Sequence, residues 1–218
     1  MVARIVALLI MAAGILAVAG CQSVYYGTME KVGIHKRDLM VGRVEDARDA
    51  QEEAKKQFQS ALEQFASVVK VKGGDLEKKY AILNEAYQES KAKADQVHRR
   101  IASVEDVSEA LFDEWEEELD QYASRTLRDD SRRKLQQTRQ DYARLIKAMK
   151  KAEKKIEPVL RAFHDQVLYL KHNLNAQAIS SLKDELLSIE DNVAGLVREM
   201  EASIREAEQF LQALKQEG

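Results

Sequence analysis

Residues 76–122, LEKKYAILNEAYQESKAKADQVHRRIASVEDVSEALFDEWEEELDQY, carry apolar and small residues at alternating steps of three and four. This is the spacing of helices that pack side by side in bundles and coiled coils. At a rise of about 1.5 Å per residue, the stretch predicts one helix of about 70 Å. Its interior-facing series is Leu76, Tyr80, Leu83, Tyr87, Ser90, Ala94, Val97, Ile101, Val104, Ser108, Leu111, Trp115, Glu118 and Tyr122.

Three further stretches of the chain repeat this spacing, one before and two after residues 76–122. None of them needs a shift of phase, so each predicts one continuous amphipathic helix. Pro158, inside the third helix, is expected to kink it locally. The three series are Met40, Val44, Ala47, Gln51, Ala54, Phe58, Ala61, Phe65 and Val68; Leu135, Thr138, Tyr142, Leu145, Met149, Ala152, Ile156, Val159, Phe163, Gln166 and Leu170; and Leu182, Leu186, Ile189, Val193, Leu196, Met200, Ser203, Ala207, Phe210 and Leu214.

Breaks in the pattern mark the expected turns. They are Gly73-Gly74, a polar stretch over 124–130, and a corner over 173–177. Asp75 and Ser131 are the expected N-terminal caps of the helices that follow the first two breaks. We therefore expect one bundle domain over 38–218, with helices over about 38–70, 75–123, 131–174 and 178–216.

Counting outward from each expected turn gives the facing positions of neighbouring antiparallel helices. Many of these pairs set a bulky side chain against a small one, as close packing requires. The pattern predicts an all-α fold, an elongated antiparallel up-down-up-down four-helix bundle with coiled-coil-like packing. Expected pairs include Phe58 with Ser90, Ala47 with Ile101, Ser108 with Leu145, Ile101 with Ala152, and Ala152 with Met200.

The second expected helix has a strongly acidic C-terminal end. It is also longer than the first helix, on which it packs. The same pairing lays the acidic stretch 113–120 beside Arg132, Arg133, Lys134 and Arg139, and we expect these charges to fix the pairing. Because the first helix is the shorter one, residues 24–37 are expected to cover the rest of the second. Gly33 would then face Trp115, where a missing side chain leaves room for the indole.

The N-terminal residues have the pattern of a bacterial lipoprotein signal peptide. Arg4 precedes an apolar run over 5–19, and Val18-Ala19-Gly20-Cys21 resembles a lipobox, with cleavage after Gly20 and lipid on Cys21. We expect a cleaved signal peptide over 1–20 and an anchor-proximal segment over 21–37. An uncleaved span is disfavoured because the run is shorter than about 20 residues. An ordinary secretory signal with an unmodified cysteine, and a cytosolic chain with an apolar start, are the alternatives.

The sequence shows no pattern typical of catalysis or of metal binding. Asp95 and His98 match one carboxylate-x-x-His element of di-iron bundles, but Ala94 and Val97 take the inward positions there. We therefore expect no catalytic residue, no metal and no cofactor, and infer that the chain is not an enzyme. The four histidines have no histidine four residues away; they are His35, His98, His164 and His172.

The predicted topology gives the two ends of the bundle different neighbours. The N-terminus, the 124–130 turn and the C-terminus share one end, so basic residues there are candidates for lipid head-group contacts. Alternatively, these side chains only balance nearby carboxylates. The opposite end is a candidate partner-binding tip, unless its asparagines only turn the chain. The head-group candidates are Arg125, Arg128, Arg132 and Arg133, and the tip candidates are Lys171, His172, Asn173 and Asn175.

Four stretches of the sequence resemble a bacterial family that is known only as a domain of unknown function, common in Gram-negative proteobacteria. They are 29–38, MEKVGIHKRD; 43–47, RVEDA; 109–116, EALFDEWE; and 165–175, DQVLYLKHNLN. The resemblance implies an all-helical envelope lipoprotein with no assigned activity, so it brings no functional residues. In Gram-negative lipoproteins, a residue other than Asp after the lipidated cysteine favours the outer membrane, and Gln22 fits that rule by analogy.

These observations favour a lipid-anchored, periplasm-facing bundle that acts as a non-enzymatic spacer, scaffold or adaptor in the cell envelope. The Gln22 analogy places it at the outer membrane. The expected partners are the membrane, through the lipid, and an envelope protein or the cell wall. Removal of 1–20 leaves a charge of 33 − 37 = −4, which argues against nucleic acid. The alternatives are a protein that assembles laterally on a membrane surface, or a small-ligand carrier or enzyme with a pocket near Pro158.

Overall fold

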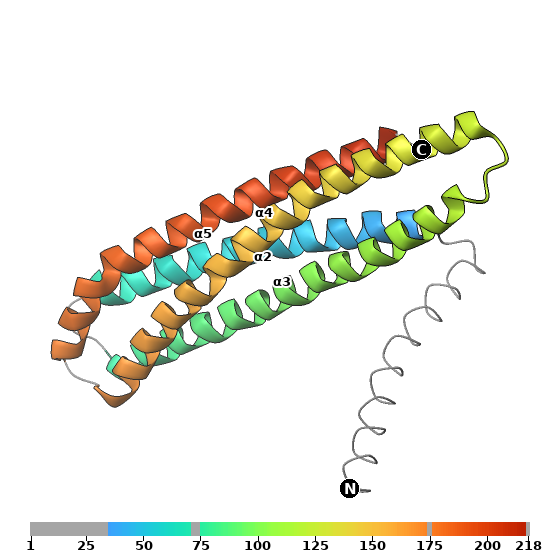
Figure 1. Ribbon diagram of the computed structural model, residues 1–218. Helices are drawn as coiled ribbons and strands as arrows, with labels where there is room; N and C mark the ends of the chain where they lie inside the picture. Colours follow the sequence, from blue (N-terminus) through green and yellow to red (C-terminus); the bar gives the residue numbers. More distant parts are fainter. Residues whose placement is uncertain (1–34, 71–74, 174–175, 217–218) are drawn as a thin grey trace, which may run out of the picture.

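The computed structural model describes residues 35–70, 75–173 and 176–216, and these residues form a bundle of four long helices (Figure 1). The helices are α2 (Lys36–Lys70), α3 (Leu76–Leu119), α4 (Arg125–His172) and α5 (Ala176–Gln216). The all-α four-helix prediction is therefore confirmed. Cys21, Gly20 and the rest of the expected signal peptide lie outside the described residues.

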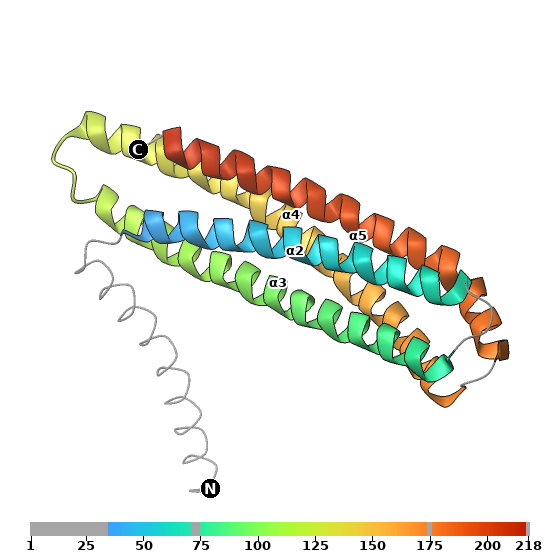
Figure 2. The same cartoon turned by 180° about the vertical axis from the view of Figure 1, so that it is seen from behind.

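The four helices form a closed ring around one core. Helix α2 packs on α3, α3 on α4, α4 on α5, and α5 returns to pack on α2. Figures 1 and 2 show consecutive helices running in opposite directions along most of the length of the molecule. Across the diagonal, the rings of Phe58 in α2 and Phe163 in α4 stack with their centroids 6.3 Å apart.

The core follows the predicted three-four spacing. Every member of the series expected for the first and fourth helices is buried, and so are most members of the other two series. The end of α3 is the exception, because Glu118 and Tyr122 are exposed while Leu119 is buried. In the last turn of α3, Leu119 takes the interior position in place of Glu118. The helix ends at Leu119, so helical spacing no longer places Tyr122 toward the core.

Contacts between surface side chains confirm the predicted antiparallel pairing. Gln57 and Glu89, which directly precede the expected pair Phe58 and Ser90, are hydrogen-bonded at 3.0 Å. Asp46 and Arg100, which precede Ala47 and Ile101, form an ion pair at 2.9 Å. Lys151 and Glu199, which precede Ala152 and Met200, also pair at 2.9 Å. The helices therefore meet at the positions that the sequence pattern indicates.

The helix caps follow the sequence at one turn and differ at the next. Asp75 caps α3, and its carboxylate accepts hydrogen bonds from the backbone N–H groups of Glu77 and Lys78. The prediction that Ser131 caps the following helix was wrong, because α4 begins at Arg125 and its cap is Ser124. The six residues before Ser131 include no glycine or proline, and Arg–Asp pairs three and four residues apart support helix there.

Helix α4 also continues without interruption through Pro158. Proline removes one backbone donor, and in this chain the surrounding packing keeps the helix intact. The neighbouring interior residues Ile156 and Val159 are both buried. Proline at this position therefore does not end the helix.

Two buried polar side chains stand out in the core. The amide of Gln51 in α2 and the hydroxyl of Ser203 in α5 are fully buried and have no hydrogen-bond partner in the described structure. Other buried hydroxyls bond to their own helix, as Ser90 donates to the carbonyl of Ala86 at 2.7 Å. An unsatisfied buried amide is costly, because its bonds with water are not replaced.

We predict that Gln51→Met stabilises the bundle. The substitution keeps the length of the side chain and removes the unsatisfied amide, so the free energy of unfolding should rise by about 1–3 kcal/mol. Urea denaturation followed by circular dichroism measures the change. Gln136→Met is the matched control, since Gln136 is exposed on α4. A loss of stability in Gln51→Met would show that the amide has a partner or an ordered water.

Candidate functional site

The basal end of the bundle, defined here as the end where α2 begins, brings three segments together. Lys36 pairs with Glu114 near the end of α3 at 2.7 Å. Arg37 donates to the backbone carbonyl of Leu214 near the end of α5. Figures 1 and 2 show the α3–α4 turn extending beyond both the start of α2 and the end of α5. The projecting hairpin is therefore the outermost described part of this end.

The predicted head-group residues lie on the first turns of α4, at this basal end. Arg125 is the most open of them, with a side chain 88% exposed and its Asp129 partner 3.8 Å away. Arg132 pairs with Asp129 at 3.3 Å and Arg133 with Asp130 at 2.9 Å. Nε of Arg128 is buried and has no partner. These ion pairs support the alternative that the arginines balance nearby carboxylates.

The acidic end of α3 meets α4 through fewer pairs than the sequence suggests. Arg139 pairs with Glu116 across the two helices and also lies over the ring of Phe112, 5.3 Å from its centroid. The hydrogen bond from Arg139 and its charge lower the pKa of Glu116. Lys134 instead pairs with Asp130 of its own helix, at 3.7 Å. Of the expected cross-helix partners, Arg139 is the one that the described contacts support.

The projecting hairpin carries a groove, which we call the basal groove, with a volume of about 270 Å³. The indole of Trp115 forms part of its wall and donates to the hydroxyl of Ser131 at 2.8 Å. Leu127, which is 59% exposed, lies on its rim. The residues that line the basal groove are Arg37, Trp115, Tyr122, Leu127, Asp130, Ser131 and Lys134.

The opposite end holds the residues predicted as a partner-binding tip, and they play unequal parts. Lys171 and His172 are exposed in the last turn of α4. Asn173 is the C-terminal cap, since its backbone N–H donates to Leu170 and its side-chain amide donates to the carbonyl of Tyr169 at 2.9 Å. Asn175 lies outside the described residues. The role of Asn173 in the turn supports the alternative that the asparagines shape the corner.

A second groove lies near this tip, between α4 and α5, and sequence reasoning missed it. This tip groove has a volume of about 520 Å³ and is lined by Asp165, Gln166, Tyr169, Ser181, Leu182 and Glu185. The hydroxyl of Tyr169 lies 3.5 Å from that of Ser181. The available signal was the pair Leu168-Tyr169, two large side chains outside the interior-facing series, and both are exposed. Neither groove includes Pro158.

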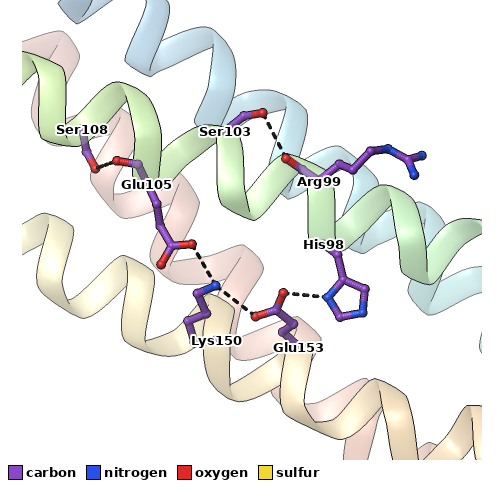
Figure 3. A network of polar contacts seen from close by, with 7 residues as sticks. All are labelled: His98, Arg99, Ser103, Glu105, Ser108, Lys150 and Glu153. Carbon is purple, nitrogen blue, oxygen red and sulfur yellow. Dashed lines mark hydrogen bonds and ion pairs between the residues drawn. The ribbon is translucent and has the colours of Figure 1, made fainter. Parts of the chain in front are cut away.

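A charged cluster joins α3 to α4 at mid-length (Figure 3). Lys150 lies between Glu105, at 2.8 Å, and Glu153, at 3.3 Å, and Glu153 also contacts His98 at 2.7 Å. Partial burial acts to lower the pKa of Lys150, but its hydrogen bonds with Glu105 and Glu153 and their charges outweigh it and raise the pKa. His98 thus joins this cluster through its contact with Glu153, and Asp95 does not take part in the contacts shown.

Within the described ranges, no group of three or more His, Cys, Asp or Glu side chains is arranged to hold a metal ion. In the same ranges, no helix combines enough length with enough apolar character to cross a bilayer.

The sequence matches a known family over most of its length. The model of a family described as "Protein of unknown function (DUF2959)" matches residues 25–214, which is most of the chain. No curated protein matches the sequence.

We predict that Lys150→Met changes how stability depends on alkaline pH. A raised pKa means that the ammonium stabilises the fold fully below its ordinary value near 10.5 and loses this effect as pH rises through the raised value. The variant should therefore be less stable at pH 7, by at most about 1 kcal/mol because the side chain is partly exposed. It should also lose less stability than the parent protein between pH 10 and 12. Parallel urea denaturations test this, and equal pH dependences would contradict it.

Proposed function

The chain belongs to the DUF2959 family of proteins of unknown function, and we propose that it is a lipid-anchored bundle that acts as a non-enzymatic spacer, scaffold or adaptor in the cell envelope. The observation that carries the proposal is the separation of its two ends. The helix that follows the Val18-Ala19-Gly20-Cys21 sequence begins at the basal end, and the tip groove lies near the other. A lipid on Cys21 would leave the tip groove pointing away from the membrane.

The dimensions of the bundle suit a spacer. Helix α4 has 48 residues, which corresponds to about 70 Å at a rise of about 1.5 Å per residue. The four helices share one continuous core, so the length is that of a packed bundle and not of a single helix. A chain of this kind can hold a contact surface at a fixed distance from its attachment point.

The placement of exposed apolar side chains favours contacts at the ends over contacts along the shaft. Among the described residues, the large exposed apolar side chains are Tyr122, Leu127, Leu168, Tyr169 and Leu187. The first two lie at the basal turn, the next two line or adjoin the tip groove, and Leu187 is on the tip-side half of α5. Lateral assembly on a membrane would instead favour a continuous apolar or basic stripe along the shaft.

We predict that Cys21 carries the lipid anchor and that Gln22 directs the protein to the outer membrane. Cys21→Ser should abolish incorporation of labelled fatty acid, and Gln22→Asp should move the lipidated protein from the outer to the inner membrane in a Gram-negative host. Labelling followed by separation of the two membranes on a density gradient measures both. Gln22→Asn is the control, because it keeps an amide at this position and should leave the protein in the outer membrane. Labelling of Cys21→Ser at the parent level would contradict the anchor.

We predict that the tip groove is where the bundle contacts its partner. A photo-crosslinking amino acid at Tyr169, in the tip groove, should capture a defined envelope component in cells, because this position combines exposure with a recessed surface. The same probe at Lys147, exposed on the shaft of α4, is the control and should capture less of that component. Equal capture at both positions would contradict a tip-specific adaptor.

A further inference from the structure

The basal groove lies where the ring of four helices is incomplete. Helix α2 begins at Lys36, which pairs with Glu114, so Trp115 and the following residues of α3 extend past the start of α2. Helix α5 ends at Gln216, close to the level where Arg37 contacts Leu214. Beyond that level, α3 and α4 continue as a projecting pair (Figures 1 and 2). The residues that line the basal groove lie on this pair and at the start of α2.

We propose that residues 25–34 of this chain, which lie outside the described residues, occupy the basal groove. They would continue the packing of α2 on α3 toward the anchor-proximal end of the chain. The inference goes beyond the proposed function and does not depend on lipid at Cys21. It makes the link between Cys21 and the bundle a docked segment and not a free tether.

Continuity of the chain supports this occupant. Residue 34 is two positions before Lys36, and Arg37 itself lines the basal groove, so the segment enters α2 at the groove. Ten residues can span up to about 33 Å when extended, whereas Trp115 lies only about 6 Å along the helix from the end of α3 at Leu119. A segment tethered this closely has a high effective concentration at the groove.

The family match supports the same occupant independently. It begins at residue 25, well before the start of α2, and it ends at residue 214, near the end of α5. Residues 25–34 therefore belong to the same family unit as the bundle. This is expected of a segment that packs on the bundle and not of a linker of arbitrary sequence.

The chemistry of the segment fits the groove. Residues 25–34, YYGTMEKVGI, contain large apolar side chains and one residue of each charge. The groove offers the half-buried indole of Trp115 and the exposed side chain of Leu127 as apolar surface. Arg37, Asp130 and Lys134 also line the groove, so charged groups of both signs border this apolar surface. Burial of Val32 or Ile34 against the indole would remove apolar surface of both the segment and Trp115 from water.

Trp115 is the only tryptophan of the chain, so its fluorescence reports on the basal groove alone. The full chain is compared with its Val32→Asp variant. A tenfold change in the docking equilibrium corresponds to about 1.4 kcal/mol, and burial of one such apolar side chain contributes more than this. The docking equilibrium constant should therefore fall at least about tenfold in Val32→Asp. The emission of Trp115 should shift to longer wavelength, and acrylamide should quench it more strongly because the indole becomes more accessible. Leu187→Asp, on a side chain 74% exposed and distant from the groove, is the matched control and should change neither.

A cross-linking experiment keeps the test decisive if Val32→Asp alters the fold. In a Cys21→Ala background, Val32→Cys with Leu127→Cys should be joined within one chain by a short bis-maleimide, and Val32→Cys with Leu187→Cys should not. Unchanged Trp115 emission in a folded Val32→Asp variant, or equal cross-linking of the two pairs, would overturn the proposal. So would cross-links mainly between chains, which indicate a second copy in the groove. A Trp115 shift in the parent protein only on adding lipid vesicles would assign the groove to the membrane.

Discussion

The structure depends on burying four series of apolar residues, spaced by three and four, in one shared core. Each helix alone would leave a long apolar face in water, and the ring of α2, α3, α4 and α5 removes all four faces at once. The chain has one cysteine, so no disulfide within the chain can assist. Residues such as Phe58, Ile101 and Met200, all fully buried, therefore supply the stabilisation that holds the helices in step.

The architecture was largely predictable because core packing leaves a periodic trace in the sequence. A single phase holds within each helix, and pairs such as Asp46 with Arg100 and Lys151 with Glu199 lie next to the interior pairs that this phase predicts. Helix ends were less predictable, because Ser124 and Ser131 are both chemically suitable caps. Short-range Arg–Asp pairs between them favour the earlier start of α4.

The grooves and charged cluster were not predictable for a different reason. Tyr169 and Ser181 come from helices on either side of a turn and meet only through the three-dimensional packing of α4 on α5. The surfaces that line the grooves follow no period, and the spacing marks only Leu168-Tyr169, two large side chains outside the interior-facing series. Asn173 illustrates the reverse case: it stood out in the sequence, yet its contacts with Tyr169 and Leu170 explain it as a helix cap.

We propose that the bundle stands with its basal end at the membrane and its tip away from it. Neutron reflectometry of the lipidated protein on a supported bilayer measures the thickness of the protein layer directly. An upright bundle should give a layer of about 70 Å, from the rise of α4. A layer of about 20–25 Å, the width of two packed helices, would mean that the bundle lies flat and would contradict the claim.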